Sequence, residues 1–290
     1  MKHKLLFLTI LMGSFSSLFC QNEILDIRDI NQKNQKKFNF SIDFGRETSI
    51  NKLSSEKLEV IDPASGVLVS NEERSKENID NYNSTYKDKF YKNYVGISAS
   101  YCFIDRLSIK LGFGLYQFHR DILDKETKED YLKFYTSSVA PMFKLGLGYS
   151  YPLNSFISLN LSPMVKYMFQ KSLKYDIIYE DDLTMDDNKI GCKYSQLQWS
   201  VPIVCTFKLQ KFIPFVGAVY SDYVYEQTLS MQKTYVGSAY DVKIKSKSNS
   251  DSKFSGIAGL GFALSDNISI SAVGTFGKVI SGQLSINVSL

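Results

Sequence analysis

The sequence lacks several features that mark whole classes of protein. It has one tryptophan, two histidines and four cysteines in 290 residues, and Cys20 already lies in the leader described below. The other three cysteines imply no disulfide framework, because the strand pattern puts Cys102 and Cys205 on opposite faces and Cys192 in a loop. Beyond residue 20, no apolar run approaches the roughly 18 residues of a spanning helix, so membrane insertion would have to use strands.

The chain also lacks a large excess of charge of either sign. Without Lys2 and Lys4, which lie in the leader, the chain carries 32 basic against 30 acidic residues. This balance excludes the basic footprint of a nucleic-acid-binding protein. The 20 phenylalanines and 19 tyrosines, in contrast, favour β-strands and membrane interfaces.

The first twenty residues predict export. Lys2 and Lys4 precede an apolar run at 5–12, and small or polar residues lead to Cys20, as in a secretory signal peptide. The alternative is a lipoprotein signal with Cys20 as the lipidated residue. Phe19 stands where that signal has a small side chain, so a cleaved signal peptide over residues 1–20 is favoured.

The mature chain repeats a period of two, the side-chain period of a strand. Residues 106–119 and 155–171 show it clearly, with apolar side chains at odd positions and mostly small or polar ones at even positions. The pattern predicts ten strands, near residues 38–49, 93–103, 106–119, 135–151, 155–171, 194–209, 212–228, 252–264, 267–276 and 280–290.

The connections alternate in length. Short ones follow the second, fourth, sixth and eighth strands, and long ones follow the first, third, fifth and seventh, the longest over residues 50–92. Only the last hairpin, at 277–279, breaks the alternation.

This pattern resembles that of the outer-membrane β-barrel proteins of Gram-negative bacteria, which have short periplasmic turns, long extracellular loops and an even number of strands. The resemblance implies an all-β, closed, antiparallel up-and-down transmembrane barrel over residues 38–290, with residues 21–37 as a polar periplasmic lead-in. About 12 residues at roughly 3.3 Å, tilted by about 45°, rise about 28 Å, enough for an apolar band of roughly 25 Å.

A soluble exported barrel or sandwich would also alternate. Its polar face would meet water and would be rich in lysine and glutamate. Here that face is mostly glycine, serine and asparagine, which suits a crowded lumen. The membrane barrel is therefore favoured.

A closed barrel must pair its last strand with its first. The apolar positions of residues 38–44 match those of residues 283–290, so these segments are expected to close the ring. In the family, the last strand is also the signal read by the barrel-insertion machinery and commonly ends in an aromatic residue. Here it ends in Leu290, which is a departure.

Few residues point to catalysis. The mature chain has one histidine, His119, which the alternation places on the lipid-facing side, and no paired constellation accompanies it. The glycines at 112–114 and 256–261 lie within strands, where close packing is expected and no phosphate-binding loop. We therefore expect no catalytic residue, no cofactor and no metal site, and an enzyme is the third choice of function.

Two charged stretches are expected to be solvated. Five acidic residues at 180–187 lack the EF-hand spacing and indicate an extracellular loop with no calcium site. Lys243, Lys245 and Lys247 could contact lipopolysaccharide phosphates, but such a run more commonly marks a hydrated edge.

The predicted lumen carries charges, since a lysine facing lipid near the membrane centre would cost about 2–4 kcal/mol. Four cations against two anions would favour anions in an open channel. Paired charges that plug the lumen are the alternative, and a blocked or very narrow lumen is preferred. The lumen-lining candidates are Asp43, Lys110, Lys144, Lys166, Lys208 and Asp222.

The function expected from the sequence is that of a monomeric surface protein whose long loops bind an extracellular ligand or partner. A narrow, porin-like and anion-preferring channel is the close alternative. Within the loops, residues 57–70 carry turn residues between two short apolar runs and predict a hairpin above the membrane. The expected partners are outer-membrane lipid, lipopolysaccharide and the insertion machinery.

Overall fold

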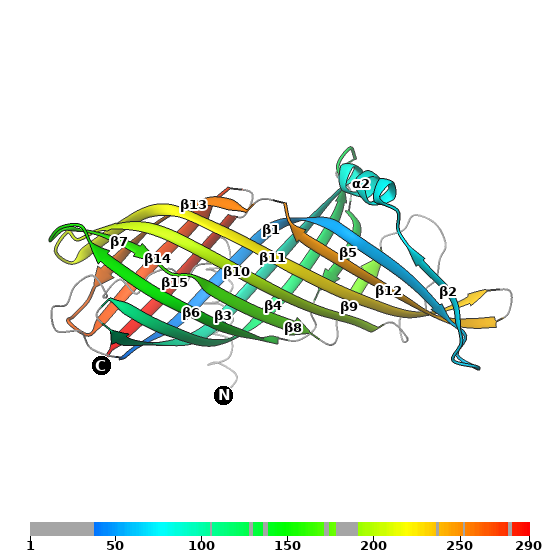
Figure 1. Ribbon diagram of the computed structural model, residues 1–290, viewed down its shortest axis with the longest axis horizontal. Helices are drawn as coiled ribbons and strands as arrows, with labels where there is room; N and C mark the ends of the chain where they lie inside the picture. Colours follow the sequence, from blue (N-terminus) through cyan, green and yellow to red (C-terminus); the bar gives the residue numbers. More distant parts are fainter. Residues whose placement is uncertain are drawn as a thin grey trace, which may run out of the picture.

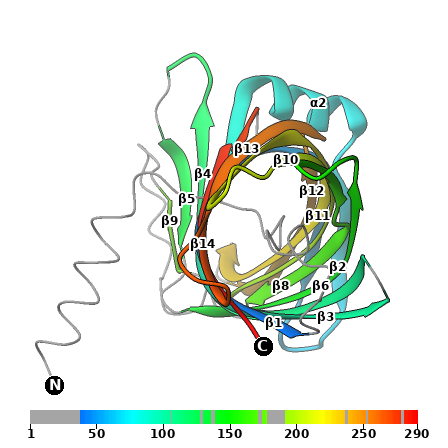
Figure 2. The same cartoon turned by 90° about the vertical axis from the view of Figure 1, so that its left-hand side faces the viewer.

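The strands form a tube. The computed structural model describes residues 38–104, 106–127, 130–135, 139–170, 174–177, 191–235, 238–251, 253–277 and 280–290. The predicted signal peptide, the lead-in and the acidic loop at 180–187 lie outside these residues. The strands cross the long axis of the molecule obliquely in Figure 1 and surround a common centre in the end-on view of Figure 2.

A ring of ten antiparallel strands closes on itself, which confirms the predicted barrel. One of the ten is broken at Ser162 and Pro163 into two segments that both pair with the same neighbour, and proline has no N–H for the ladder. In ring order, the strands are β1 (Phe38–Ile61), β3 (Tyr86–Ile104), β4 (Leu107–Asp124), β6 (Ala140–Pro152), β7 (Ile157–Leu161) with β8 (Met164–Gln170), β10 (Gly191–Phe207), β11 (Phe212–Tyr235), β13 (Phe254–Ala263), β14 (Ile268–Phe276) and β15 (Ile280–Ser289).

The last strand closes the ring as predicted. β15 pairs with β1 from Asn39 opposite Ser289 to Thr48 opposite Ile280. The Leu290 amide extends this ladder by donating to the Phe38 carbonyl at 3.0 Å. The chain therefore ends in hydrogen-bonded structure rather than in a frayed tail.

The two faces of the barrel differ in polarity. On β1, Phe40 is 46% exposed on the outside, whereas Asp43 is 1% exposed on the inside. The same alternation on the other strands surrounds the barrel with exposed aliphatic and aromatic side chains and fills the lumen with serine, asparagine and glutamine. An apolar outside around a polar inside is the arrangement that a lipid bilayer requires.

The two ends of the barrel differ in length. The short turns near residues 105, 154, 210 and 266 lie at the end that also holds the carboxyl terminus. At about 3.3 Å per residue and about 45° of tilt, the 24 residues of β1 rise about 56 Å and the 9 residues of β14 about 21 Å. β1 therefore continues well past the apolar band of roughly 25 Å, whereas β14 is slightly shorter than the band.

Additional elements extend the long end, where the sequence predicted loops. They are β2 (Leu68–Glu73), α2 (Lys76–Thr85), β5 (Asp130–Tyr135), β9 (Lys174–Ile177) and β12 (Ser238–Ser250). The predicted connection over residues 50–92 is therefore wrong in extent, because β1 runs to Ile61 and β3 begins at Tyr86. The predicted hairpin is confirmed, since β2 pairs with the end of β1. None of the helices in the described ranges is long and apolar enough to cross a bilayer.

β12 makes the barrel taper. At membrane level β13, β14 and β15 separate β11 from β1, whereas above them β12 alone bridges the same two strands. At about 4.8 Å per strand spacing, four spacings become two, so this side of the wall narrows by about 10 Å. This narrowing begins near Tyr225, which pairs with Ser248 of β12.

Candidate functional site

Four aromatic side chains meet in the tapered part of the lumen, and we name this group the lumen plug: Phe90, Phe118, Tyr194 and Tyr225. Their ring centroids lie 4.6–5.0 Å apart for neighbouring pairs, and none is more than 3% exposed. Phe90 and Phe118 come from β3 and β4, and the tyrosines come from β10 and β11. Other strands separate these two pairs on both sides of the ring, so the contacts cross the lumen. The plug therefore joins opposite walls.

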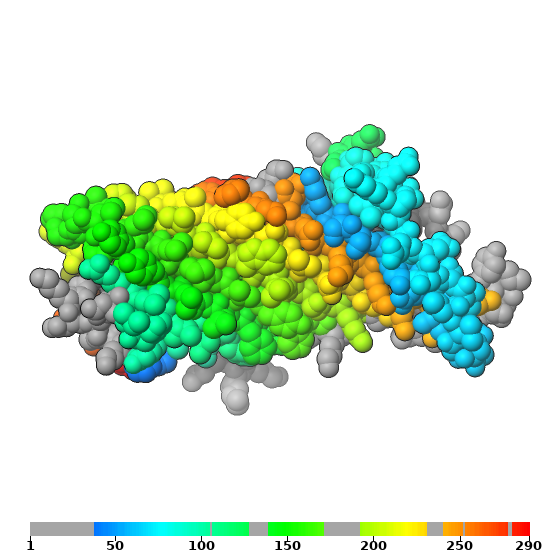
Figure 3. Space-filling view, in the orientation of Figure 1, coloured from blue at the N-terminus to red at the C-terminus, as the bar shows by residue number. Residues whose placement is uncertain are grey.

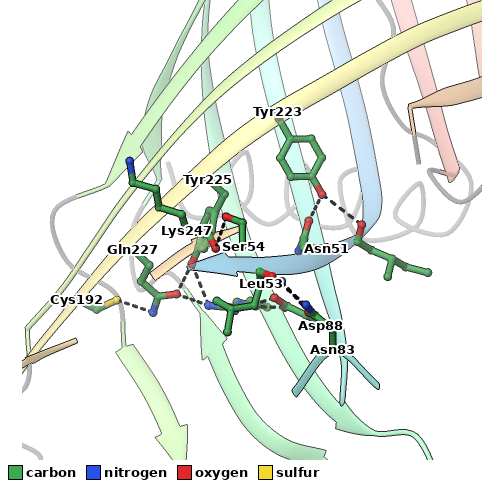
Figure 4. A network of polar contacts seen from close by, with 12 residues as sticks. Asn51, Leu53, Ser54, Asn83, Asp88, Cys192, Tyr223, Tyr225, Gln227 and Lys247 are labelled. Carbon is green, nitrogen blue, oxygen red and sulfur yellow. Dashed lines mark hydrogen bonds and ion pairs between the residues drawn. The ribbon is translucent and has the colours of Figure 1, made fainter. Parts of the chain in front are cut away.

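A buried ion pair is attached to the plug. Arg120 of β4 donates to both carboxylate oxygens of Asp88, at 2.8 and 2.7 Å, and its side chain is 5% exposed. The same guanidinium donates to the Tyr225 hydroxyl at 3.1 Å and to Gln227, and Gln227 donates to the Cys192 sulfur. Figure 4 shows this network with its labelled members on both walls.

The guanidinium also stacks between rings. Its central carbon lies 5.3 Å from the Phe90 centroid and 5.2 Å from that of Tyr225. A guanidinium suits this place, because it can form paired hydrogen bonds to the carboxylate and also interact favourably with nearby aromatic rings. Arg120 thus ties the polar and aromatic parts of the closure together.

A second ion pair lies nearer the membrane. Glu47 of β1 and Lys92 of β3 are register partners, their charged atoms are 3.2 Å apart, and both side chains are 2% exposed. The Lys92 ammonium lies 5.5 Å from the Tyr223 ring. Tyr223 in turn bonds Asn51 of β1 (Figure 4), so this layer connects β11 with β1 and β3.

The third layer contains three of the residues proposed from the sequence. Lys144 and Lys166 are cross-strand partners, and Asp43 lies 3.8 Å from the Lys144 ammonium. Adjacent lysines repel each other, but both ammonium groups lie over the Tyr94 ring, at 5.1 and 5.6 Å. The Tyr94 hydroxyl donates to Gln283 of β15 at 3.0 Å, which holds the ring over β1 on the lumen side of the wall.

The other three proposed residues lie apart from this layer. Lys110 is on the lumen face of β4 beside Gly148, and Lys208 follows the end of β10 at the short rim. Asp222, predicted to point inward, instead shares the outer face with its partner Trp199 and forms an ion pair with Lys253 at 2.8 Å. An outward carboxylate fits there because β11 has left the apolar band.

Four lumen charges were missed in the sequence: Glu47, Asp88, Lys92 and Arg120. Asp88 and Lys92 lay in a predicted loop, and Arg120 lay one residue beyond a predicted strand. The parity of the flanking strands, continued outward, would have placed all of them inside. In the described part of the chain, the lumen then buries four cations and three carboxylates.

His119 lies on the outer face of β4, as the alternation predicted. Its ring bonds the Asp121 carboxylate and packs edge-on against Tyr91. This arrangement orients the imidazole at the membrane surface. Cys192, which was expected in a loop, is instead a buried residue of β10 facing the lumen. The three cysteines of the described residues are free thiols.

The lysines at 243, 245 and 247 belong to β12 and form part of its outer face. Lys245 bonds Glu59 of β1 at 2.8 Å, and Lys247 bonds Glu226 of β11 at 2.7 Å. The bond to Lys245 lowers the pKa of the Glu59 carboxyl below its usual range. β12 is thus fixed to both neighbours by charge as well as by its backbone.

No protein-family model and no curated protein matches this chain. Solved structures similar to it include the outer membrane protease OmpT from Escherichia coli, at 10% identity and a TM-score of 0.41, over 89% of this chain and all of OmpT. Another is the outer membrane protein OprG from Pseudomonas aeruginosa, at 10% identity and a TM-score of 0.41, over 88% of this chain and 98% of OprG. The translocator domain of the autotransporter NalP from Neisseria meningitidis is similar at 6% identity and a TM-score of 0.41. The match covers 91% of this chain and 92% of the NalP domain.

Proposed function

Starting from an outer-membrane β-barrel with an apolar outer band and a polar interior, we propose that this protein acts through its extracellular extensions, as a surface interaction protein. The observation that carries the proposal is the lumen plug, whose aromatic contacts join opposite walls. A barrel with a packed lumen passes no solute, so its exposed parts perform the function.

The extensions offer surface for this role. The hairpin of β1 and β2, the helix α2 and the hairpin of β11 and β12 all lie beyond the apolar band (Figures 1 and 3). α2 buries no side chain, yet it is held in place, because Asn83 exchanges two hydrogen bonds with the backbone of Leu53 at 2.8 and 2.9 Å. A polar helix held on the rim with six of its ten residues exposed suits contact with a partner.

The alternative is a narrow channel that prefers anions. The excess of one buried cation over the buried carboxylates supports this preference. Opening would require Arg120 to separate from Asp88 and the four rings to part. If the channel reading is right, Lys144→Glu changes the ion preference of the open state.

The proposal takes the protein to be non-enzymatic. His119 and Asp121 sit two residues apart on one strand face, where the carboxylate orients the ring. Outer-membrane lipid would contact the apolar band, and the insertion machinery would read the last strand.

The decisive experiment is single-channel conductance of the refolded mature protein in a planar bilayer. A heat-modifiable electrophoretic mobility first establishes that the barrel is folded. We expect a silent membrane. Discrete anion-favouring steps would overturn the proposal in favour of the channel.

A second experiment tests the exposed role directly. An epitope inserted at Ser65, in the turn of the β1–β2 hairpin, should bind antibody on intact cells. An epitope inserted at Asn154, in a short turn, is the matched control and should bind only after the cells are permeabilised. The reverse result would put the extensions inside the cell envelope and would refute a surface role.

A further inference from the structure

β2 has a free edge. It pairs with β1 on one side, and no other strand of the described ranges pairs with it on the other. Five of its six residues are exposed, so neither face is covered. An uncovered edge strand presents a row of unpaired backbone groups that can accept another strand.

The register identifies which groups point to this edge. The Arg74 amide donates to the Glu56 carbonyl at 2.9 Å, so Arg74 faces β1. Backbone direction alternates along a strand, so Glu72 also faces β1, whereas Asn71 and Glu73 direct their N–H and C=O groups outward. The free edge therefore offers two donors and two acceptors.

The hairpin is preorganised. In its turn, both Asp62 carboxylate oxygens accept hydrogen bonds, at 3.0 Å from the Ala64 amide and at 2.6 Å from the Ser65 hydroxyl. These bonds lower the pKa of the Asp62 carboxyl. Gly66 adopts a φ of 70°, which a glycine tolerates without strain. At the other end of β2, Arg74 forms an ion pair with Glu56 at 3.2 Å. A rigid edge loses little entropy when a partner binds.

The chemistry of β2 changes along its length. At the tip, Val67, Leu68 and Val69 are 60%, 48% and 58% exposed. At the base, Glu72 and Glu73 are exposed on opposite faces, and neither forms an ion pair among the described residues. Consecutive residues of a strand point to opposite faces. A matching strand would thus carry apolar residues opposite the tip and two consecutive basic residues opposite the base.

We propose that the free edge of β2 binds an extended basic segment of a partner protein, which adds to the β1–β2 hairpin as a further strand. The proposal rests on the surface role argued above and names the class of partner. Main-chain hydrogen bonds to Asn71 and Glu73 would supply affinity, and the two glutamates would select for charge.

The test uses the refolded full-length barrel in lipid nanodiscs and a labelled synthetic peptide, Ser-Lys-Lys-Thr-Thr-Val-Val-Ser, followed by fluorescence anisotropy. We expect saturable binding, and no binding of the same peptide with glutamates in place of its lysines. Asn71→Pro removes one outward N–H while keeping the pairing to β1, and it should weaken binding at least tenfold. Asn71→Ala is the matched control and should bind as the parent does.

Several outcomes would overturn the inference: no saturable binding, equal binding of the acidic peptide, or equal affinities for the Pro and Ala variants. Self-association that Asn71→Pro abolishes would also overturn it, since the edge would then pair with a second copy. Folding of each variant is checked by heat-modifiable mobility. If the protein shows no conductance in the planar bilayer and the peptide does not bind, only this inference is refuted. Conductance steps in the planar bilayer would instead refute the proposed surface role.

Discussion

Removing Arg120 should destabilise the barrel strongly. Arg120→Ala leaves the Asp88 carboxylate, which is 2% exposed, without its bidentate partner. Breaking a buried pair on one side costs about 3–5 kcal/mol, and the lost stacking on Phe90 and Tyr225 adds about 1 kcal/mol. At 1.4 kcal/mol for each tenfold change, the folding equilibrium should fall by about three powers of ten or more.

The assay follows from the single tryptophan. Trp199 lies on the outer face of β10 opposite Asp222, at the edge of the apolar band, so its fluorescence should shift to the red when unfolding in urea exposes it fully to water. Reversible unfolding in phospholipid vesicles then gives the free energy for the parent, Arg120→Ala, Asp88→Ala and the double variant. The control Arg120→Lys keeps the charge but loses the paired hydrogen bonds, and it should be intermediate in stability.

The double variant tests whether Arg120 and Asp88 stabilise the barrel as one unit. If the two groups act as one unit, removing both should cost about as much as removing either, since no unpaired buried charge remains. If the single losses are small, or if they add within about 0.5 kcal/mol, the ion pair does not hold the closure and the reasoning is refuted.

Three further predictions concern other parts of the barrel. Lys245→Ala should raise the pKa of Glu59 toward 4.5, as measured by NMR titration, and an unchanged titration would contradict this prediction. Because the pKa of Glu59 is lowered in the folded protein, the Lys245–Glu59 bond contributes to stability above about pH 4.5, and this contribution is lost as the pH falls through the folded pKa. Gly45→Ala places a Cβ 2.4 Å from the Tyr94 ring and should cost about 1–3 kcal/mol in the urea assay, so unchanged stability would be inconsistent with the packing. Asn83→Ala should free α2 from the rim and speed its amide exchange by mass spectrometry while exchange in the barrel strands stays slow.

The sequence predicted the membrane-level barrel well for a physical reason. Within the bilayer, lipid on one face and a crowded lumen on the other enforce strict alternation, as on β4 and β6. Above the bilayer, water reaches the outer face, and charges are allowed on both sides. There the pattern fades, so the sequence predicts a loop where β12 forms and places Asp222 on the wrong face. Gly217 and Ala218 had already blurred that strand.

The sequence predicted which charged side chains point into the lumen better than it predicted which of them meet there. Asp43, Lys144 and Lys166 followed from alternation alone. That they meet over Tyr94 depends on which strands lie near each other across the ring, and a period of two contains no such information. The lumen plug has the same origin, since Phe90 and Tyr225 are more than a hundred residues apart in the sequence and meet across the ring.

The shared edge of β1 also bears on how the barrel closes correctly. β12 occupies this edge from Asn51 onward and β15 up to Thr48, which leaves only Ser49 and Ile50 between them. The Asp251 amide already donates to the Ile50 carbonyl at 3.2 Å, so a closing strand that slipped by two residues toward the outside would compete with this bond. The segment that follows β12 along the edge of β1 therefore opposes an outward slip of the final hairpin, and the register of the last seam depends on an extracellular extension as well as on the seam itself.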